Sequence, residues 1–334
     1  MVTPTFLLRK YFFKIEMTHT AAIQSILKKE FNEDMTSVSR MTTGLCNEVY
    51  SVSTPTRTVI VRLNEDGNKM VGSETHIPLF QSVDIPVPHI LASDYSKSLV
   101  PFAYQIQTQL PGMDIGQVVS TLTDLQLVNI AKNIAEISKK LSTLPTNGKY
   151  GWVGGEDPLY DSWTDIMQKM RTDIIERNNK TGVIGSKYIS IVDKILEKFK
   201  SYFDKMPSTF YYDDMCSKNV LIHDGNFSGI VDLDTMAYGD PLEGIGRIMA
   251  SWYGTEYGKV YSDAVIAEMK LSDAQKEVVA VYAVLNRIYW LSEHGIQWNE
   301  NTTTNINKEA VEKDKKIIDI LWKSLQDICT FDEK

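Results

Sequence analysis

Apolar residues recur at two different periods along this chain of 334 residues, and the period changes near residue 110. Short apolar runs separated by turn residues predict β-strands before that point. These strands are expected at Thr36–Met41, Val49–Ser53, Thr58–Leu63, His89–Ala92 and Phe102–Gln107. Two helices are expected in the same part, an amphipathic one over residues 21–31 with Thr18 or Thr20 as its N-cap, and one from Gly72 to about Ser82.

Beyond residue 120, apolar residues three and four positions apart predict a mainly helical region. The helices are expected at Leu122–Leu144, Tyr160–Asn178, Ser186–Lys205, Gly246–Tyr253, Ser262–Lys270, Asp273–His294 and Ile306–Cys329. The two periods predict two lobes, residues 17–108 and residues 109–334. Arg9, Lys10 and Lys14 interrupt the apolar run of residues 1–16, which disfavours a secretory signal, and these residues are interpreted as an N-terminal extension because Met17 is a suitable start.

A short hairpin within the helical region gathers side chains that carry oxygen. The apolar runs Val220-Leu221-Ile222 and Gly229-Ile230-Val231 flank the turn sequence H-D-G-N, which is typical of a β-hairpin. Asp214 precedes the hairpin, Asn219 follows five residues later, and Asp232 closes it. Mg²⁺ prefers oxygen ligands, and a hydroxyl that attacks a phosphate needs a positioned carboxylate. The pattern therefore indicates phosphoryl transfer from a Mg-nucleotide.

The sequence of this segment resembles that of the aminoglycoside phosphotransferase family, which also includes choline, homoserine and fructosamine kinases. The resemblance rests on Asp214-x4-Asn219-Val220-Leu221, then Ile230-Val231-Asp232-Leu233-Asp234, then Gly239-Asp240-Pro241. This chain departs from it at Tyr212-Asp213, where His-Gly is usual, and at Gly244, where an Asp is common. The resemblance implies a two-lobed, protein-kinase-like α+β fold. Its N-lobe is an antiparallel sheet with helices, and its C-lobe is mainly helical with a catalytic β-hairpin.

The same resemblance implies a role for each site residue, with ATP or GTP and Mg²⁺ as cofactors. Asp214 aligns the acceptor hydroxyl, while Asn219 and Asp232 hold the metal. Asp213 is the alternative base, but the spacing from Asp214 to Asn219 favours Asp214 for this role. Asp234 supports a second metal or orders the loop, and Asp240 caps the following helix. Nucleotide contacts are expected from the phosphate loop (Gly44, Asn47), the strand cation Arg62 with its partner Glu74, the hinge (Gln107, Thr108, Gln109) and the adenine-facing pair Leu221 and Val231.

Charge and cysteine content narrow the class of partner. The formal net charge of −8 disfavours nucleic acid. No apolar stretch approaches the roughly 20 residues that span a bilayer. Cys46, Cys216 and Cys329 lack metal-ligand spacing and read as reduced thiols of a cytoplasmic protein. A monomer or a homodimer that acts on a small molecule is expected.

The acceptor is the open part of the interpretation. An aminoglycoside-like antibiotic, and hence antibiotic resistance, is the named expectation, with a sugar, an amino alcohol or another small metabolite as the alternative. A nucleotide-binding pseudokinase without catalysis is a further alternative, because of the departures at Tyr212-Asp213 and Gly244. Carboxylates that could meet acceptor amines are Glu243, Glu256, Asp263, Glu293 and Glu300.

Overall fold

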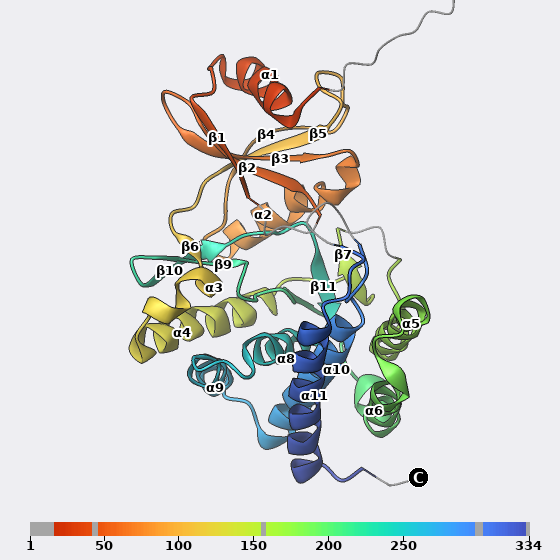
Figure 1. Cartoon of the computed structure of the whole chain (residues 1–334). Coiled ribbons are helices and arrows are strands. Elements are labelled where there is room, and N and C mark those ends of the chain that lie inside the picture. The colour runs from red at the N-terminus through yellow and green to blue at the C-terminus, as the bar shows by residue number, and fades with distance from the viewer. Residues whose placement is uncertain (1–16, 42–45, 155–157, 298–302, 332–334) are drawn as a thin grey trace, which may run out of the picture.

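The computed structural model describes residues 17–41, 46–154, 158–297 and 303–331, which form two lobes (Figure 1). The N-terminal lobe contains a five-stranded antiparallel sheet with the order β1-β2-β3-β5-β4. Its strands are β1 (Ser37–Met41), β2 (Glu48–Ser53), β3 (Thr58–Asn64), β4 (Ile90–Asp94) and β5 (Ala103–Thr108). The predicted strands and the predicted fold class are confirmed.

Two helices of this lobe lie on opposite sides of the sheet (Figure 1). Thr18 caps the N-terminus of helix α1 (His19–Phe31), because its hydroxyl accepts a hydrogen bond from the N–H of Ala21. Its apolar face, with Ile23 and Leu27, packs on the inner residues of the sheet. Helix α2 (Gly72–Ser82) instead packs Ile77 and Phe80 into the core of the other lobe. Helix α2 therefore couples the sheet to the C-terminal lobe.

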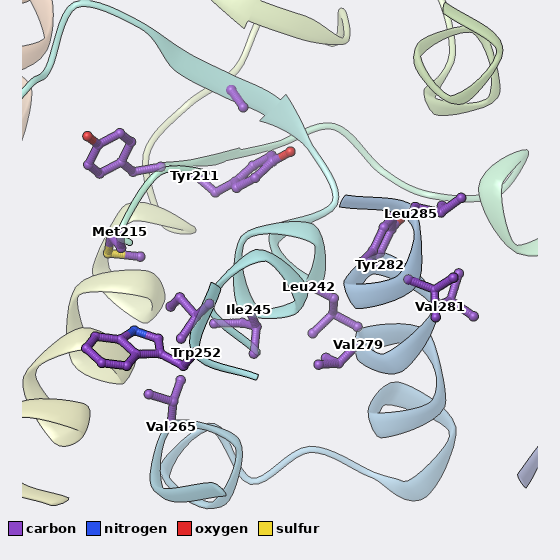
Figure 2. Packing of buried hydrophobic residues seen from close by; sticks show 14 of the residues in the cluster. Tyr211, Met215, Leu242, Ile245, Trp252, Val265, Val279, Val281, Tyr282 and Leu285 are labelled. Carbon is purple, nitrogen blue, oxygen red and sulfur yellow. The ribbon is translucent and has the colours of Figure 1, made fainter. Parts of the chain in front are cut away.

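The C-terminal lobe is mainly helical, as predicted. Its helices are α3 (Ile115–Val118), α4 (Asp124–Leu141), α5 (Trp163–Thr181), α6 (Gly185–Lys198), α7 (Lys200–Phe203), α8 (Pro241–Trp252), α9 (Gly258–Met269), α10 (Asp273–Leu291) and α11 (Lys308–Ile328). Figure 2 shows Leu242 and Ile245 of α8 packed near Val279 and Tyr282 of α10. A Cβ atom at Gly246 would lie 2.4 Å from the Cβ of Tyr282, so glycine permits this close crossing.

Two small sheets connect the helices to the lobe interface. The predicted hairpin consists of β9 (Val220–His223) and β10 (Asn226–Ile230), with β6 (Met113–Asp114) paired to β9. Its turn residues Asp224 and Gly225 have φ of 49° and 75°, the positive values that a tight type I′ hairpin turn requires. The other sheet has the order β7-β11-β8. Its strands are β7 (Gly151–Val153), β8 (Thr209–Tyr211) and β11 (Met236–Gly239).

The sequence interpretation differs from the structure mainly at short elements. It did not include β6, β7 or β11, which have two, three and four residues and are too short to show a period. Helix α8 begins at Pro241 rather than at Gly246, because proline suits the first turn of a helix. The predicted extension over residues 1–16 lies outside the described residues. None of the helices that the structure describes is long and apolar enough to cross a membrane.

Candidate active site

The catalytic loop follows β8 and directs two adjacent carboxylates to different sides. The side chain of Asp213 is 8% exposed; it accepts hydrogen bonds from Arg247 Nη1 at 3.0 Å and from Trp152 Nε1 at 3.1 Å. The side chain of Asp214 is 42% exposed, and its Oδ2 accepts a hydrogen bond from Asn219 Nδ2 at 2.8 Å. A substrate can therefore reach Asp214, while Asp213 is committed to the interior.

Tyr212 connects the predicted catalytic loop by hydrogen bonds to the segment that contains Asp232. Its buried hydroxyl lies 3.1 Å from the carbonyl oxygen of Val231 and 2.9 Å from that of Asp232. The same hydroxyl accepts a hydrogen bond from Asn219 Nδ2 at 3.1 Å. Sequence reasoning noted Tyr212 only as a departure from His and missed this role. The available signal was that tyrosine is also a large side chain with a polar end.

Asn219 and Asp232 have the donor set that a Mg²⁺ ion bound to a nucleotide would need. The Asn219 amide nitrogen donates hydrogen bonds to Tyr212 and Asp214, so its Oδ1 is the atom that can face a metal. The side chain of Asp232 is 53% exposed. No group of three or more His, Cys, Asp or Glu that could hold a metal occurs among the described residues. Phosphate and water oxygens would thus have to complete the coordination.

The backbone and the charge of Asp232 are both unusual. Its φ of 64° lies in the left-handed region, which costs energy for a residue with a side chain and is common at functional sites. Loss of hydration and the neighbouring charge of Asp234 raise the pKa of Asp232 to about 6, although Arg62 opposes the shift. A divalent cation placed at Asp232 would relieve this repulsion.

The predicted partner of Arg62 is wrong. We expected an ion pair with Glu74, but the guanidinium instead forms a two-pronged pair with Asp234, with Nη1 at 2.8 Å from Oδ1. Glu74 accepts hydrogen bonds from Tyr95 Oη at 2.8 Å and from Gln105 Nε2 at 3.3 Å. The physical reason is that α2 begins directly against Asp234, since a Cβ at Gly72 would lie 1.9 Å from the Asp234 carbonyl oxygen.

Asn47 also converges on Asp234. Its Nδ2 donates to Asp234 Oδ2 at 2.9 Å, and its Oδ1 accepts from Asn64 Nδ2 at 2.8 Å. Asp234 therefore binds the sheet cation and the end of the predicted phosphate loop together, which supports its ordering role. Gly44 of that loop lies outside the described residues.

The hinge and adenine-facing residues occupy the positions expected at the end of β5 and along the hairpin. Gln107 is buried and donates to Gln105, and Gln109 is exposed. The N–H of Thr108 donates to the carbonyl of His89 at 2.9 Å, so this amide is already used within the sheet. Leu221 and Val231 are half-buried beside the site. Their contacts with a purine remain a prediction.

Gly244 has no carboxylate that could anchor the loop containing Asp213. Helix α8 anchors this loop in another way. A Cβ at Gly244 would lie 3.2 Å from the carbonyl oxygen of Tyr212, so the loop rests directly on the helix. One turn later, Arg247 holds Asp213. Asp240 caps α8 by accepting from the N–H of Leu242 at 3.0 Å, as predicted. The loop is anchored by a cation on the helix and an acid on the loop.

The carboxylates proposed for acceptor amines are mostly engaged. Buried Glu243 accepts hydrogen bonds from Tyr211 at 3.2 Å and Asn286 at 2.9 Å. Glu293 pairs with Arg177 at 3.4 Å. The two others within the described residues lie in exposed positions, Asp263 in an ion pair with Lys259 and Glu256 after α8, while Glu300 lies outside them.

Asp234→Asn should weaken nucleotide binding and lower stability together. The change leaves Arg62 buried with only the more distant Asp232, at 3.6 Å, as a counter-charge. Breaking a buried ion pair costs about 3 kcal/mol, and we expect the nucleotide KM to rise at least about tenfold. Urea unfolding and initial rates at varied nucleotide measure both effects. Asp263→Asn, at an exposed position of α9, is the matched control, and an unchanged nucleotide KM in Asp234→Asn would contradict the ordering role.

Glu243 predicts a dependence of stability on pH. Burial and the charge of Asp213 raise its pKa from 4.5 to about 7, against the opposing effects of Arg247, Asn286 and Tyr211. The folded chain thus keeps a proton that the unfolded chain releases between these values, so stability falls as pH rises through this window, by at most about 3 kcal/mol. Glu243→Gln should remove this dependence in urea unfolding at pH 5 and pH 8, whereas exposed Glu309→Gln should keep it. Equal slopes for Glu243→Gln and the parent chain would contradict this.

With this geometry established, comparison with known proteins places the chain. A model of the phosphotransferase enzyme family matches residues 37–270, and the chain belongs to this family. Comparison with curated protein sequences gives no match. Solved structures of aminoglycoside phosphotransferases and a related kinase share the protein-kinase-like fold, as predicted.

Three of these structures show how far the similarity extends. A thermostable mutant of aminoglycoside phosphotransferase APH(4)-Ia, in complex with AMP-PNP and hygromycin B, is 16% identical, with a TM-score of 0.67 over 91% of this chain and 98% of the other. A mutant aminoglycoside 2′-phosphotransferase-IIIa with GDP is 12% identical, with a TM-score of 0.67 over 92% and 98%. A protein assigned as fructosamine-3-kinase from Haemophilus somnus 129PT is 14% identical, with a TM-score of 0.61 over 90% and 96%. Identities this low support the fold alone.

Proposed function

We propose that this protein transfers the γ-phosphate of ATP or GTP, as its Mg²⁺ complex, to a hydroxyl group of a small molecule. The observation that carries the proposal is that Asn219 hydrogen-bonds both to the Asp214 carboxylate and to the Tyr212 hydroxyl, which in turn bonds the backbone carbonyl of Asp232. Asp214 accepts a hydrogen bond from the acceptor hydroxyl and takes its proton as the oxygen bonds to the γ-phosphorus. The bond from that phosphorus to the bridging oxygen breaks, and ADP or GDP leaves.

Other residues of the chain bind and orient the nucleotide. Asn219 Oδ1 and the Asp232 carboxylate would hold Mg²⁺, which when bound neutralises charge on the phosphates. Arg62, kept in place by Asp234, lies beside Asp232 and is suited to the α- and β-phosphates. The hinge after β5 and the pair Leu221 and Val231 would receive the base. These assignments, and the division into a nucleotide lobe over residues 17–108 and an acceptor lobe over 109–334, belong to the proposal.

The acceptor class divides the proposal. The hygromycin B complex of a structural neighbour supports testing aminoglycosides first, with antibiotic resistance as the biological role. The paired state of Glu243 and Glu293 favours a small metabolite instead. A cytoplasmic location fits the three unbridged cysteines and the need for a nucleoside triphosphate.

The deciding experiment is an assay of nucleoside diphosphate release with ATP and with GTP across aminoglycosides, sugars and amino alcohols. Turnover with any acceptor, lost in Asp232→Ala, supports the kinase. The other outcome is that the protein binds the nucleotide and Mg²⁺ but shows neither turnover with any acceptor nor slow hydrolysis. That result would support the pseudokinase alternative and contradict the kinase.

A further inference from the structure

Two arginines flank one tryptophan on the acceptor side of Asp214. The guanidinium of Arg247, on α8, lies 5.6 Å from the ring centroid of Trp290, on α10. The guanidinium of Arg287, also on α10, lies 5.7 Å from the same ring. Trp290 is half-buried. A planar, cationic and aromatic surface of this kind suits an anionic ligand with an apolar or hydroxylated body.

Each of the two arginines has a buried donor that nothing satisfies. The Nε of Arg247 and the Nε of Arg287 are both buried without a hydrogen-bond partner among the described residues. Buried N–H groups of a charged side chain are seldom left unpaired, because the loss of hydration is costly. Burial lowers the pKa of Arg287, and Asp314 opposes the shift. Neither guanidinium group thus has its full set of partners within the described residues.

Arg247 lies close enough to the reacting group to contact the same substrate. Its Nη1 is bound to Asp213, and its Nε lies 3.8 Å from Asp214 Oδ1, which is too far for a hydrogen bond. The Arg247 side chain is 20% exposed, so a carboxylate or phosphate can approach the part of the guanidinium that Asp213 does not bind. A compound whose hydroxyl rests on Asp214 can then place a neighbouring substituent against this exposed part.

The surrounding acids argue against a polycation at the same place. Glu243 is buried and hydrogen-bonded, and Glu293 has Arg177 as its partner. Asp213 is neutralised by Arg247, and Asp314 pairs with Arg287 at 3.2 Å. Among the described residues around the two arginines, Asp214 is thus the carboxylate left for the substrate, and it is required for the hydroxyl.

We propose that the acceptor is a hydroxy compound bearing an anionic oxygen group, a carboxylate or a phosphate, which Arg247 binds beside Trp290. This inference rests on the proposed function, since the anion is placed relative to the phosphorylated hydroxyl. It names a class of substrate and leaves the reaction unchanged.

The first test compares acceptors that differ only in the anionic group. The pairs are glycerate with glycerol, gluconate with glucitol, and glucose 6-phosphate with glucose, assayed for diphosphate release and for product mass. We expect the anionic member of at least one pair to have a kcat/KM about 10- to 100-fold higher, the range of a charge-assisted hydrogen bond. The carboxylate and phosphate arms show which group is used. Preference for the neutral members, or for kanamycin over all of them, would overturn the proposal.

The second test measures anion binding without phosphoryl transfer. Malonate or inorganic phosphate should raise the melting temperature and change the fluorescence that Trp290→Phe removes, and Arg247→Gln should weaken this binding about tenfold or more. Arg247→Lys should restore part of it. Arg171→Gln, which breaks an exposed ion pair with Asp193 between α5 and α6, is the matched control and should bind as the parent chain does.

Because Arg247 also anchors Asp213, the Asp213→Asn variant separates anchoring from anion binding. This variant should keep the anion response, since it leaves the guanidinium in place. Loss of the response in Asp213→Asn together with its retention in Arg247→Gln would overturn the proposal. If no compound is phosphorylated but the Arg247-dependent response is present, the anion site stands and the proposed function fails. If neutral acceptors are phosphorylated and the Arg247-dependent response is absent, the proposed function stands and the anion site fails.

Discussion

Replacing Asp214 by asparagine should lower kcat for phosphoryl transfer by about 10²- to 10⁴-fold, the usual contribution of a positioned acid–base group. Asparagine retains the shape of the side chain and the contact with Asn219, but it cannot take the proton of the acceptor hydroxyl. Partial loss of hydration raises the pKa of Asp214, with Arg247 opposing the shift and Asp213 adding to it, which makes its carboxylate a better proton acceptor. The nucleotide KM should change little, because Asp214 contacts the acceptor. Steady-state kinetics with a saturating acceptor would measure both constants.

Asp213→Asn is the matched comparison, because it changes the adjacent residue in the same way. Asp213 is buried against Arg247 and Trp152, so its loss should lower the melting temperature and reduce kcat by a smaller factor, about tenfold. Asp214→Asn should therefore mainly lower kcat, whereas Asp213→Asn should mainly lower the melting temperature. Abolished turnover in Asp213→Asn with intact turnover in Asp214→Asn would transfer the role of base to Asp213.

Local spacing was sufficient to predict that the residues at the centre of the candidate site lie close together. The order of Asp214, Asn219 and Asp232 around a hairpin turn restricts their separation, because a tight turn leaves its two strands one register. The structure places Asp214 and Asn219 in direct contact and joins Asn219 to the Asp232 segment through Tyr212. The strands of the N-terminal sheet were also predicted from local patterns, but their order was not predicted, because β5 lies between β3 and β4.

The choice between two carboxylates for Arg62 could not be made from spacing. Glu74 and Asp234 are both acids, and which one faces β3 depends on how α2 sits against the other lobe. The contact of Gly72 with the Asp234 carbonyl decides this, and it joins residues 162 positions apart in the sequence. A long-range packing contact of this kind leaves no periodic signal in the chain.

The role of Arg247 could have been found from the sequence. It lies three residues after Gly244, so both occupy one face of a helix that starts at Pro241. An unexpected acid at Asp213, a missing acid at Gly244 and a cation one turn later together indicate an exchange of charges. The structure shows this exchange as the ion pair between Asp213 and Arg247.

Replacing Asp232 should produce the largest loss of activity, and its unusual backbone allows the metal role to be separated from folding. Asparagine tolerates the left-handed conformation with φ of 64°, whereas alanine adds about 1 kcal/mol of strain there. Asp232→Asn and Asp232→Ala should both lose at least about 10³-fold in kcat/KM, since a bound metal supplies several kcal/mol. Urea unfolding should show a loss of stability in the alanine variant alone. Turnover of Asp232→Asn close to that of the parent chain would exclude Asp232 as a metal ligand.

The raised pKa of Asp232 adds a dependence on pH to the same prediction. Below about pH 6 the metal-free carboxylate holds a proton, which Mg²⁺ must displace to bind. The Mg²⁺ concentration for half-maximal nucleotide binding should therefore rise about tenfold for each pH unit below 6 and stay nearly constant above pH 7. Calorimetric titration of the nucleotide at several Mg²⁺ concentrations measures this directly. In Asp232→Asn the pH dependence should vanish along with the Mg²⁺ dependence, because the titrating group and the ligand are one carboxylate. A pH dependence as steep in this variant as in the parent chain would place the proton on the nucleotide phosphates or on another residue, with Asp234 and Asp214 the nearest carboxylates that raise the pKa of Asp232.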